Sequence, residues 1–274
     1  MKIIVYTALF ALHSLAAAEC ASSLPLTGTA SIPYCDARTQ RCIPAEDAIL
    51  NYSRARDDDP STLYLSLHAS PRHFYDADWR ILGAEELADI LRPKLSAEVR
   101  KIILLASWSG VAAEPGGQSL AVKLSRALKG FPVQGQDGFI WLDKDGKSRT
   151  TRQAFTLSQG GGPYQVAEGG EVMVALAGGW PATFEAELMQ HKHAQGIRRA
   201  GAGWEMFFLC PERALKAFTA ASQLGDSIAA YNAAMLYLER GSKGDRQTAL
   251  RLLRQAAAAD DQHAWRKLSA LSAK

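Results

Sequence analysis

The sequence predicts a three-layer α/β sandwich with a mainly parallel sheet, followed by an all-α tail of helical repeats. Residues 101–106 (KIILLA) form a continuous apolar run, which is typical of a parallel strand buried on both faces. Segments with leucines at helical spacing, at 84–95 and 119–128, alternate with short strand-like runs. In the tail, two alanine- and leucine-rich stretches align when the chain is shifted so that Ala214 falls on Ala249.

These patterns divide the 274 residues into four segments. The predicted division is a signal peptide at 1–18, an irregular cystine-pinned lead-in at 19–60, the α/β domain at 61–210 and the helical repeats at 211–274. In the α/β domain we expect strands at 62–67, 101–106, 131–133, 139–142 and 171–177, helices at 84–95, 119–128 and 184–194, and a glycine-rich loop at 158–170. The lead-in carries one expected helix, near 45–56.

The N-terminus has the three parts of an export signal. Lys2 supplies a positive charge, residues 3–15 are mostly apolar, and the small residues 16–18 precede the expected cleavage site. The apolar run is shorter than the roughly 20 residues that span a bilayer. A lipoprotein is the alternative, but Glu19 precedes Cys20 where lipoprotein signals have a small residue. We therefore expect a periplasmic or secreted protein that does not insert into the membrane after cleavage.

The charge and the motifs exclude several classes of function. The formal net charge of the full chain is +3 at pH 7, which is too small to favour nucleic acid or an acidic membrane as a partner. The glycines at 160–162 lack the preceding strand and the Gly-Lys pair of a phosphate-binding loop. The histidines are scattered, and we interpret His73 as a surface residue in a polar turn. We expect neither a cofactor nor a metal ion.

The four cysteines of the mature chain predict disulfides, because an even number in an exported protein is typical of paired thiols. Four cysteines allow three pairings. Cys35 and Cys42 enclose a short polar loop and are the first choice, which leaves Cys20 with Cys210. A zinc site is the alternative, but the spacing is not that of a C-x-x-C motif.

Two candidate catalytic side chains follow predicted strands. His68 comes directly after the strand at 62–67, and Ser107 comes directly after the strand at 101–106. The carboxyl ends of parallel strands are where α/β folds place their sites. A nucleophile and a base at neighbouring strand ends have the arrangement of covalent acyl transfer.

These strand ends resemble those of the caspase-like cysteine peptidases. The matching stretches are Leu67-His68-Ala69 and Ala106-Ser107-Trp108-Ser109-Gly110, within a resemblance that spans residues 61–146. The resemblance implies a strand ending in His-Gly and a second strand that presents a nucleophilic cysteine. Here Ala69 replaces the glycine and Ser107 stands in place of the cysteine. A serine hydroxyl is far less acidic than a thiol, so we expect a non-catalytic scaffold. The alternative is an active hydrolase that uses Ser107 and His68.

The tail resembles the Sel-like repeats, which are relatives of the tetratricopeptide repeats. The matching stretches are residues 214–234 and 249–268, each of which reads as helix, short turn, helix. The second turn departs from the family, because Asp260 and Asp261 replace Gly225 and Asp226. The resemblance implies protein binding or packing against the core. A plain helical bundle cap is the alternative.

Two tryptophans are candidate anchors for a partner protein. Trp108 and Trp180 lie in stretches rich in glycine and proline, where we expect exposed side chains. Together with the export signal and the tail, they favour an exported protein that binds another protein. The predicted form is an immunity or inhibitor protein against a secreted antibacterial effector, as the Sel-like resemblance implies. The alternatives are the hydrolase and an adaptor of the cell envelope.

Overall fold

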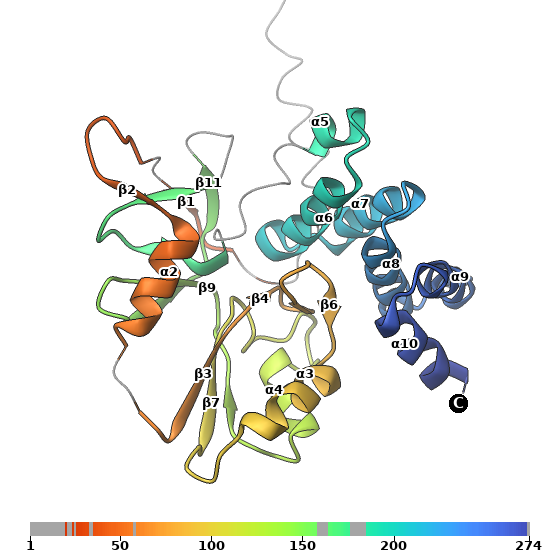
Figure 1. The fold of residues 1–274 in the computed structure, drawn as a ribbon, viewed down its shortest axis with the longest axis horizontal. Coiled ribbons are helices and arrows are strands. Elements are labelled where there is room, and N and C mark those ends of the chain that lie inside the picture. The colour runs from red at the N-terminus through yellow and green to blue at the C-terminus, as the bar shows by residue number, and fades with distance from the viewer. Residues whose placement is uncertain are drawn as a thin grey trace, which may run out of the picture.

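The computed structural model describes residues 20, 24, 26–32, 35–56, 59–157, 164–175 and 185–272. It confirms an α/β part followed by a helical tail, and Figure 1 shows the two side by side. Residues 1–18, the predicted signal peptide, lie outside the described residues. Within the described residues, no helix combines the length and the apolar character needed to cross a membrane.

The centre of the α/β part is a small parallel sheet. β3 (Thr62–Ser66), β7 (Lys101–Leu105) and β8 (Val133–Gln134) are ordered β3-β7-β8. Thr62 pairs with Lys101 and Ser66 pairs with Leu105, so the carboxyl ends of β3 and β7 lie level with each other. The apolar run of β7 is buried because both faces of this strand are covered.

Helices pack on the two faces of β7. α3 (Ala84–Leu91) and α4 (Leu120–Ala127) share an apolar cluster with Ile102 and Leu104. α2 (Ala45–Arg54) shares another cluster with Leu105. The three helices occur where the sequence predicts them. α3 ends before the predicted 95 because Pro93 lies in a short 3₁₀ turn, η1 (Arg92–Lys94), where its missing N–H is tolerated.

The strands do not form one large sheet. β9 (Phe139–Leu142) pairs in antiparallel fashion with β10 (Ser148–Thr151) and β13 (Val172–Met173). The lead-in contributes strands of its own: β1 (Thr29–Ile32) pairs with β11 (Ala154–Leu157), and β2 (Cys42–Pro44) pairs with β12 (Gln165–Ala167). The prediction of a mainly parallel sheet therefore holds only for β3-β7-β8 and for β1-β11 among the described strands.

A meander of three two-residue strands follows β3, and the sequence does not predict it. It consists of β4 (His68–Ala69), β5 (Phe74–Tyr75) and β6 (Ile81–Leu82), paired in antiparallel order. Strands of this length are too short to produce a periodic pattern in the sequence. The meander matters because it faces the helical tail.

The tail is a stack of antiparallel helices. After α5 (Glu185–Gln190) come α6 (Ala194–Phe208), α7 (Pro211–Gln223), α8 (Ser227–Arg240), α9 (Asp245–Ala258) and α10 (Gln262–Ser272). Each helix packs on the next one along the chain. The stack thus begins before residue 211, the predicted boundary.

The predicted repeat has a structural basis in two aspartates. Asp226 accepts a hydrogen bond from the N–H of Ala229 and caps α8, and Asp261 accepts one from the N–H of Ala264 at the start of α10. The alanines that face neighbouring helices are buried. Leu224 and Trp265 are also apolar residues of the tail, but their side chains are 39% and 53% exposed.

Candidate functional site

Ser107 lies at the end of β7 but is not presented to solvent. Its side chain is buried, and its Oγ accepts a hydrogen bond of 3.2 Å from the backbone N–H of Ile140 on β9. The hydroxyl therefore has a structural role, because it satisfies a buried backbone donor.

His68 lies at the neighbouring strand end, in β4, with its ring stacked on Trp79 at 4.6 Å between centroids. Its Nδ1 is buried and has no hydrogen-bond partner among the described residues. Burial, together with nearby Arg199, lowers the pKa of His68 to about 4, so the ring is neutral at physiological pH. In the described part of the chain no hydrogen bond joins His68 to Ser107. A general base must lie within hydrogen-bond reach of the proton that it removes, and this arrangement does not provide that contact.

Replacing Ser107 with alanine should cost stability and leave function intact. Loss of the hydroxyl leaves the buried N–H of Ile140 without an acceptor, which costs about 1–3 kcal/mol. Chemical denaturation should detect this loss, while His68→Ala and Ser107→Ala both retain biological activity. If either folded variant loses that activity by several orders of magnitude, the pair is catalytic.

The expectation of an exposed Trp108 is wrong. Its side chain is 1% exposed and packs edge-on against Phe139 at 5.3 Å. Trp108 has a φ of 63°, and this left-handed turn directs the indole into the core. In this structure its surface is not available to a partner. Trp180, the other candidate anchor, lies outside the described residues.

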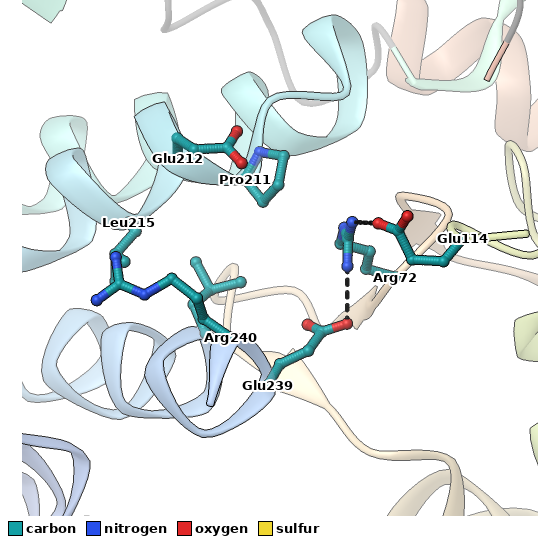
Figure 2. Close-up of a pocket in the computed structure, with 8 residues that line it drawn as sticks. Arg72, Glu114, Pro211, Glu212, Leu215, Glu239 and Arg240 are labelled. Atoms are coloured by element: carbon teal, nitrogen blue, oxygen red, sulfur yellow. Dashed lines mark hydrogen bonds and ion pairs between the residues drawn. The ribbon is translucent and has the colours of Figure 1, made fainter. Parts of the chain in front are cut away.

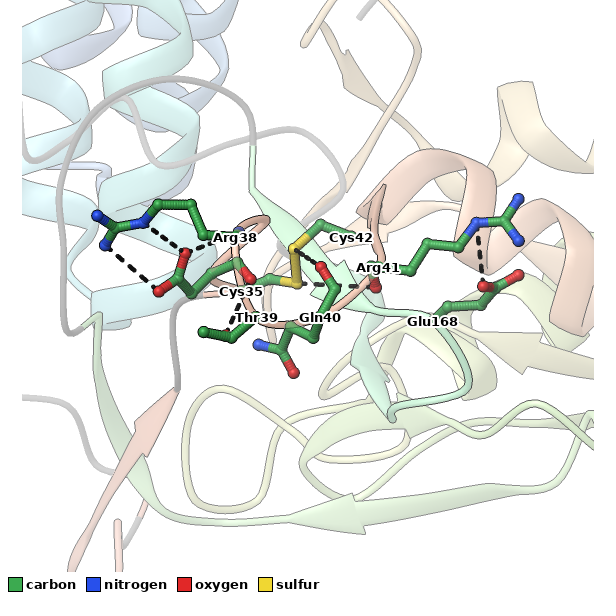
Figure 3. Close-up of a disulfide and its surroundings, with 8 residues drawn as sticks. Cys35, Arg38, Thr39, Gln40, Arg41, Cys42 and Glu168 are labelled. Atoms are coloured by element: carbon green, nitrogen blue, oxygen red, sulfur yellow. Dashed lines mark hydrogen bonds and ion pairs between the residues drawn. A yellow bond between two sulfur atoms is a disulfide. The ribbon is translucent and has the colours of Figure 1, made fainter.

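Both predicted disulfides are present, Cys20–Cys210 and Cys35–Cys42. The second closes a short loop (Figure 3). In this loop the carbonyl of Asp36 accepts hydrogen bonds from the N–H groups of Thr39 and Gln40. Among the described residues, no group of three or more His, Cys, Asp or Glu side chains is placed to hold a metal ion.

A buried polar network lies between the meander and the tail, around Glu205 of α6. Glu205 is 1% exposed. Its carboxylate accepts hydrogen bonds from the Ser70 hydroxyl at 2.7 Å, from His73 Nδ1 at 2.7 Å and from the Tyr75 hydroxyl at 2.5 Å. A buried carboxylate is costly unless such donors surround it, so the three side chains and Glu205 depend on one another.

His73 connects this network to a second helix. Its Nε2 lies 3.1 Å from a carboxylate oxygen of Glu239 on α8, and Glu239 also accepts a hydrogen bond from Arg72. Burial alone would lower the pKa of His73, but Glu205 and Glu239 outweigh it and raise the pKa to about 9. His73 is therefore an imidazolium held between two carboxylates. The prediction of a surface histidine is wrong, because its side chain is 12% exposed.

The network should make stability depend on pH in a defined window. The folded pKa of His73 is raised from 6.5 to about 9, so its contribution is complete below pH 6.5 and is lost as the pH rises through about 9. Burial alone would raise the pKa of Glu239, but His73 and Arg72 outweigh it and lower this pKa from 4.5 to about 2. The contribution of Glu239 to stability is therefore complete above pH 4.5 and is lost as the pH falls towards 2. Urea unfolding should show a fall in stability of about 3 kcal/mol on the alkaline side.

The control for this pH dependence is a pair of histidine variants. His73→Gln should remove the alkaline fall, whereas His191→Gln, at an exposed position, should retain it. An alkaline fall that persists unchanged in His73→Gln contradicts the assignment.

A groove opens beside this network, between the core and the tail. One pocket of 310 Å³ is lined by Arg72 and Glu114 of the core and by residues of α7 and α8. A second pocket of 550 Å³ runs along α7 and shares Glu212, Leu215 and Arg240 with the first. Figure 2 shows Arg72 joined to Glu114 and Glu239 on one side of the first pocket, with Glu212 on α7 across from them.

The sequence contained one signal for this junction that periodicity does not detect. Glu205 is the only acidic residue in the otherwise apolar and small stretch 200–209 (AGAGWEMFFL). A charged residue in a buried helix requires partners, but the sequence does not say which. Its partners lie 130 to 135 positions away in the chain.

A comparison with family models matches residues 38–150 to a family described as a domain of unknown function, DUF8616. The match runs from the cystine loop to β10 and includes His68, Arg72 and Ser107. It ends before the tail, so Glu205 and the helices that line the groove lie outside it. No curated protein and no solved structure matches the chain.

Proposed function

We propose that the protein is exported and binds another protein through the groove between its core and its helical tail. The observation that carries this proposal is a pair of adjoining pockets along α7, with volumes of 310 Å³ and 550 Å³, beside the hydrogen-bonded junction around Glu205. Helical repeats commonly present extended binding surfaces of this kind. The specific form we propose is a periplasmic or secreted immunity protein that inhibits a secreted antibacterial effector.

The α/β part then serves as a scaffold. We infer that it is a degenerate relative of the caspase-like fold, since helices lie on both faces of the parallel strands and His68 and Ser107 follow β3 and β7. The buried Oγ of Ser107 supports a non-catalytic role. We infer that the tail is a Sel-like repeat, as the matching caps at Asp226 and Asp261 support.

Export is supported by the two disulfides, which persist in oxidising compartments. Cys20–Cys210 joins the start of the mature chain to the residue that precedes α7. The groove is thus built on a helix that the disulfide holds in place.

The experiment that tests this function compares groove variants. Lys216→Trp and Gln223→Trp place large side chains on exposed positions of α7 that line the second pocket. Lys123→Trp, on the exposed face of α4, is the matched control. A protein from the producing cells should bind to the immobilised wild type and to immobilised Lys123→Trp. It should not bind to the double groove variant.

The immunity form requires a second result. The retained protein should stop bacterial growth when it is exported alone, and co-export of the wild type should restore growth. A retained protein without toxicity favours the envelope adaptor instead. Equal retention by the groove variant contradicts binding through this surface.

A further inference from the structure

The charges around the first pocket identify the chemistry of the segment that it accepts. The pocket is lined by two arginines and three glutamates, with an apolar floor of Pro211, Leu215 and Leu236. The arginines are Arg72 and Arg240 and the glutamates are Glu114, Glu212 and Glu239, so the lining carries a net charge of −1 by this count. A pocket that is both apolar and acidic complements an apolar segment with a basic side chain.

Both arginines are already matched by carboxylates of the protein. Arg72 bonds to Glu114 and Glu239, and the Arg240 guanidinium donates to both oxygens of Asp245, at 2.8 and 2.6 Å. Their positive charge is therefore largely compensated within the chain. An acidic ligand would have to compete with these pairs.

Glu212 differs from the other two glutamates of the pocket. It is exposed at the start of α7, and no described cation lies within ion-pair distance of its carboxylate, although its charge also acts on Arg240. Glu114 is also accessible, with a side chain that is 58% exposed, although it is bonded to Arg72. The two carboxylates approach the pocket from opposite sides, one from the tail and one from the core (Figure 2).

We propose that the first pocket binds a lysine or arginine side chain of the partner, flanked by apolar residues, with its cationic end between Glu212 and Glu114, since Glu239 is already paired with Arg72 and His73. This inference rests on the proposed function, because it defines the partner segment that occupies the groove. The stem of a lysine or arginine is apolar and packs on leucine side chains, while its charged end stays at the rim.

The test uses pooled synthetic peptides and the mature protein. The peptides share four apolar residues flanking a central position that holds lysine, norleucine or glutamate, with glycine-serine ends for solubility. Wild type should retain the lysine peptides about ten-fold better than the glutamate peptides, and added salt should reduce this preference. Retention that is equal for all three, or higher for glutamate, overturns the inference.

Glu212→Gln is the decisive variant, because Glu212 is exposed and its loss disturbs no ion pair of the junction. It should lower retention of the lysine peptides by roughly three- to five-fold. Glu85→Gln, at an exposed position on α3, is the control and should change nothing. An unchanged lysine preference in Glu212→Gln also overturns the assignment.

The two proposals fail in different ways. If the groove variant loses the partner but the peptides show no lysine preference, the groove still binds the partner and only the proposed recognition of a basic side chain is rejected. Retention of the partner by the groove variant rejects the function itself.

Discussion

Glu205→Ala is expected to lower the free energy of unfolding by about 3–5 kcal/mol. The substitution removes the acceptor shared by Ser70, His73 and Tyr75 and leaves the imidazolium of His73 buried with Glu239 as its remaining carboxylate. Three donors with largely buried side chains lose their partner at once. Urea denaturation followed by circular dichroism measures the change.

An exposed ion pair provides the control for Glu205. Glu171 pairs with Arg149, and both side chains are more than 40% exposed. Glu171→Ala should cost no more than about 1 kcal/mol, because water solvates the arginine that remains. If Glu205→Ala lowers the free energy of unfolding no more than this control does, the network around Glu205 does not stabilise the molecule as described.

Removing the Cys20–Cys210 disulfide is expected to have the second large effect. Its cysteines are separated by 190 residues, whereas Cys35 and Cys42 are separated by 7. In the chain-entropy description, a longer closed loop restricts the unfolded chain more, which predicts losses of about 5 and about 2–3 kcal/mol for the two bridges.

Paired alanine substitutions separate the two disulfides. Alanine suits Cys210 because this side chain is fully buried. The Cys20→Ala/Cys210→Ala protein should melt well below the Cys35→Ala/Cys42→Ala protein. The reverse order would mean that the long bridge does not hold the lead-in to the tail.

The sequence predicts the elements of this fold better than their assembly. The apolar run of β7 and the spaced leucines of α4 are local signals, and the structure confirms both. The sequence predicts the position of β9 but not its antiparallel pairing with β10 and β13, because pairing depends on residues that are distant in the chain. The meander β4–β6 was missed because two-residue strands have no period.

The candidate site shows the same limit. His68 and Ser107 were identified by their position after strands, but hydrogen bonding and burial decide their chemistry, and neither is visible in the sequence. Trp108 follows a strand in a glycine-containing stretch, which suggests exposure, yet its left-handed backbone turns the indole inward. His73 looked like an ordinary surface residue because both of its carboxylate partners come from the tail.

Hydrogen exchange in the presence of the captured partner tests the central claim most directly. The account predicts slower exchange in α7 and in the C-terminal turns of α8, which line the two pockets, while β7 and the Ser107 strand end remain unchanged. Protection at the strand end around Ser107, with α7 and α8 exchanging as in the free protein, would contradict binding through the groove.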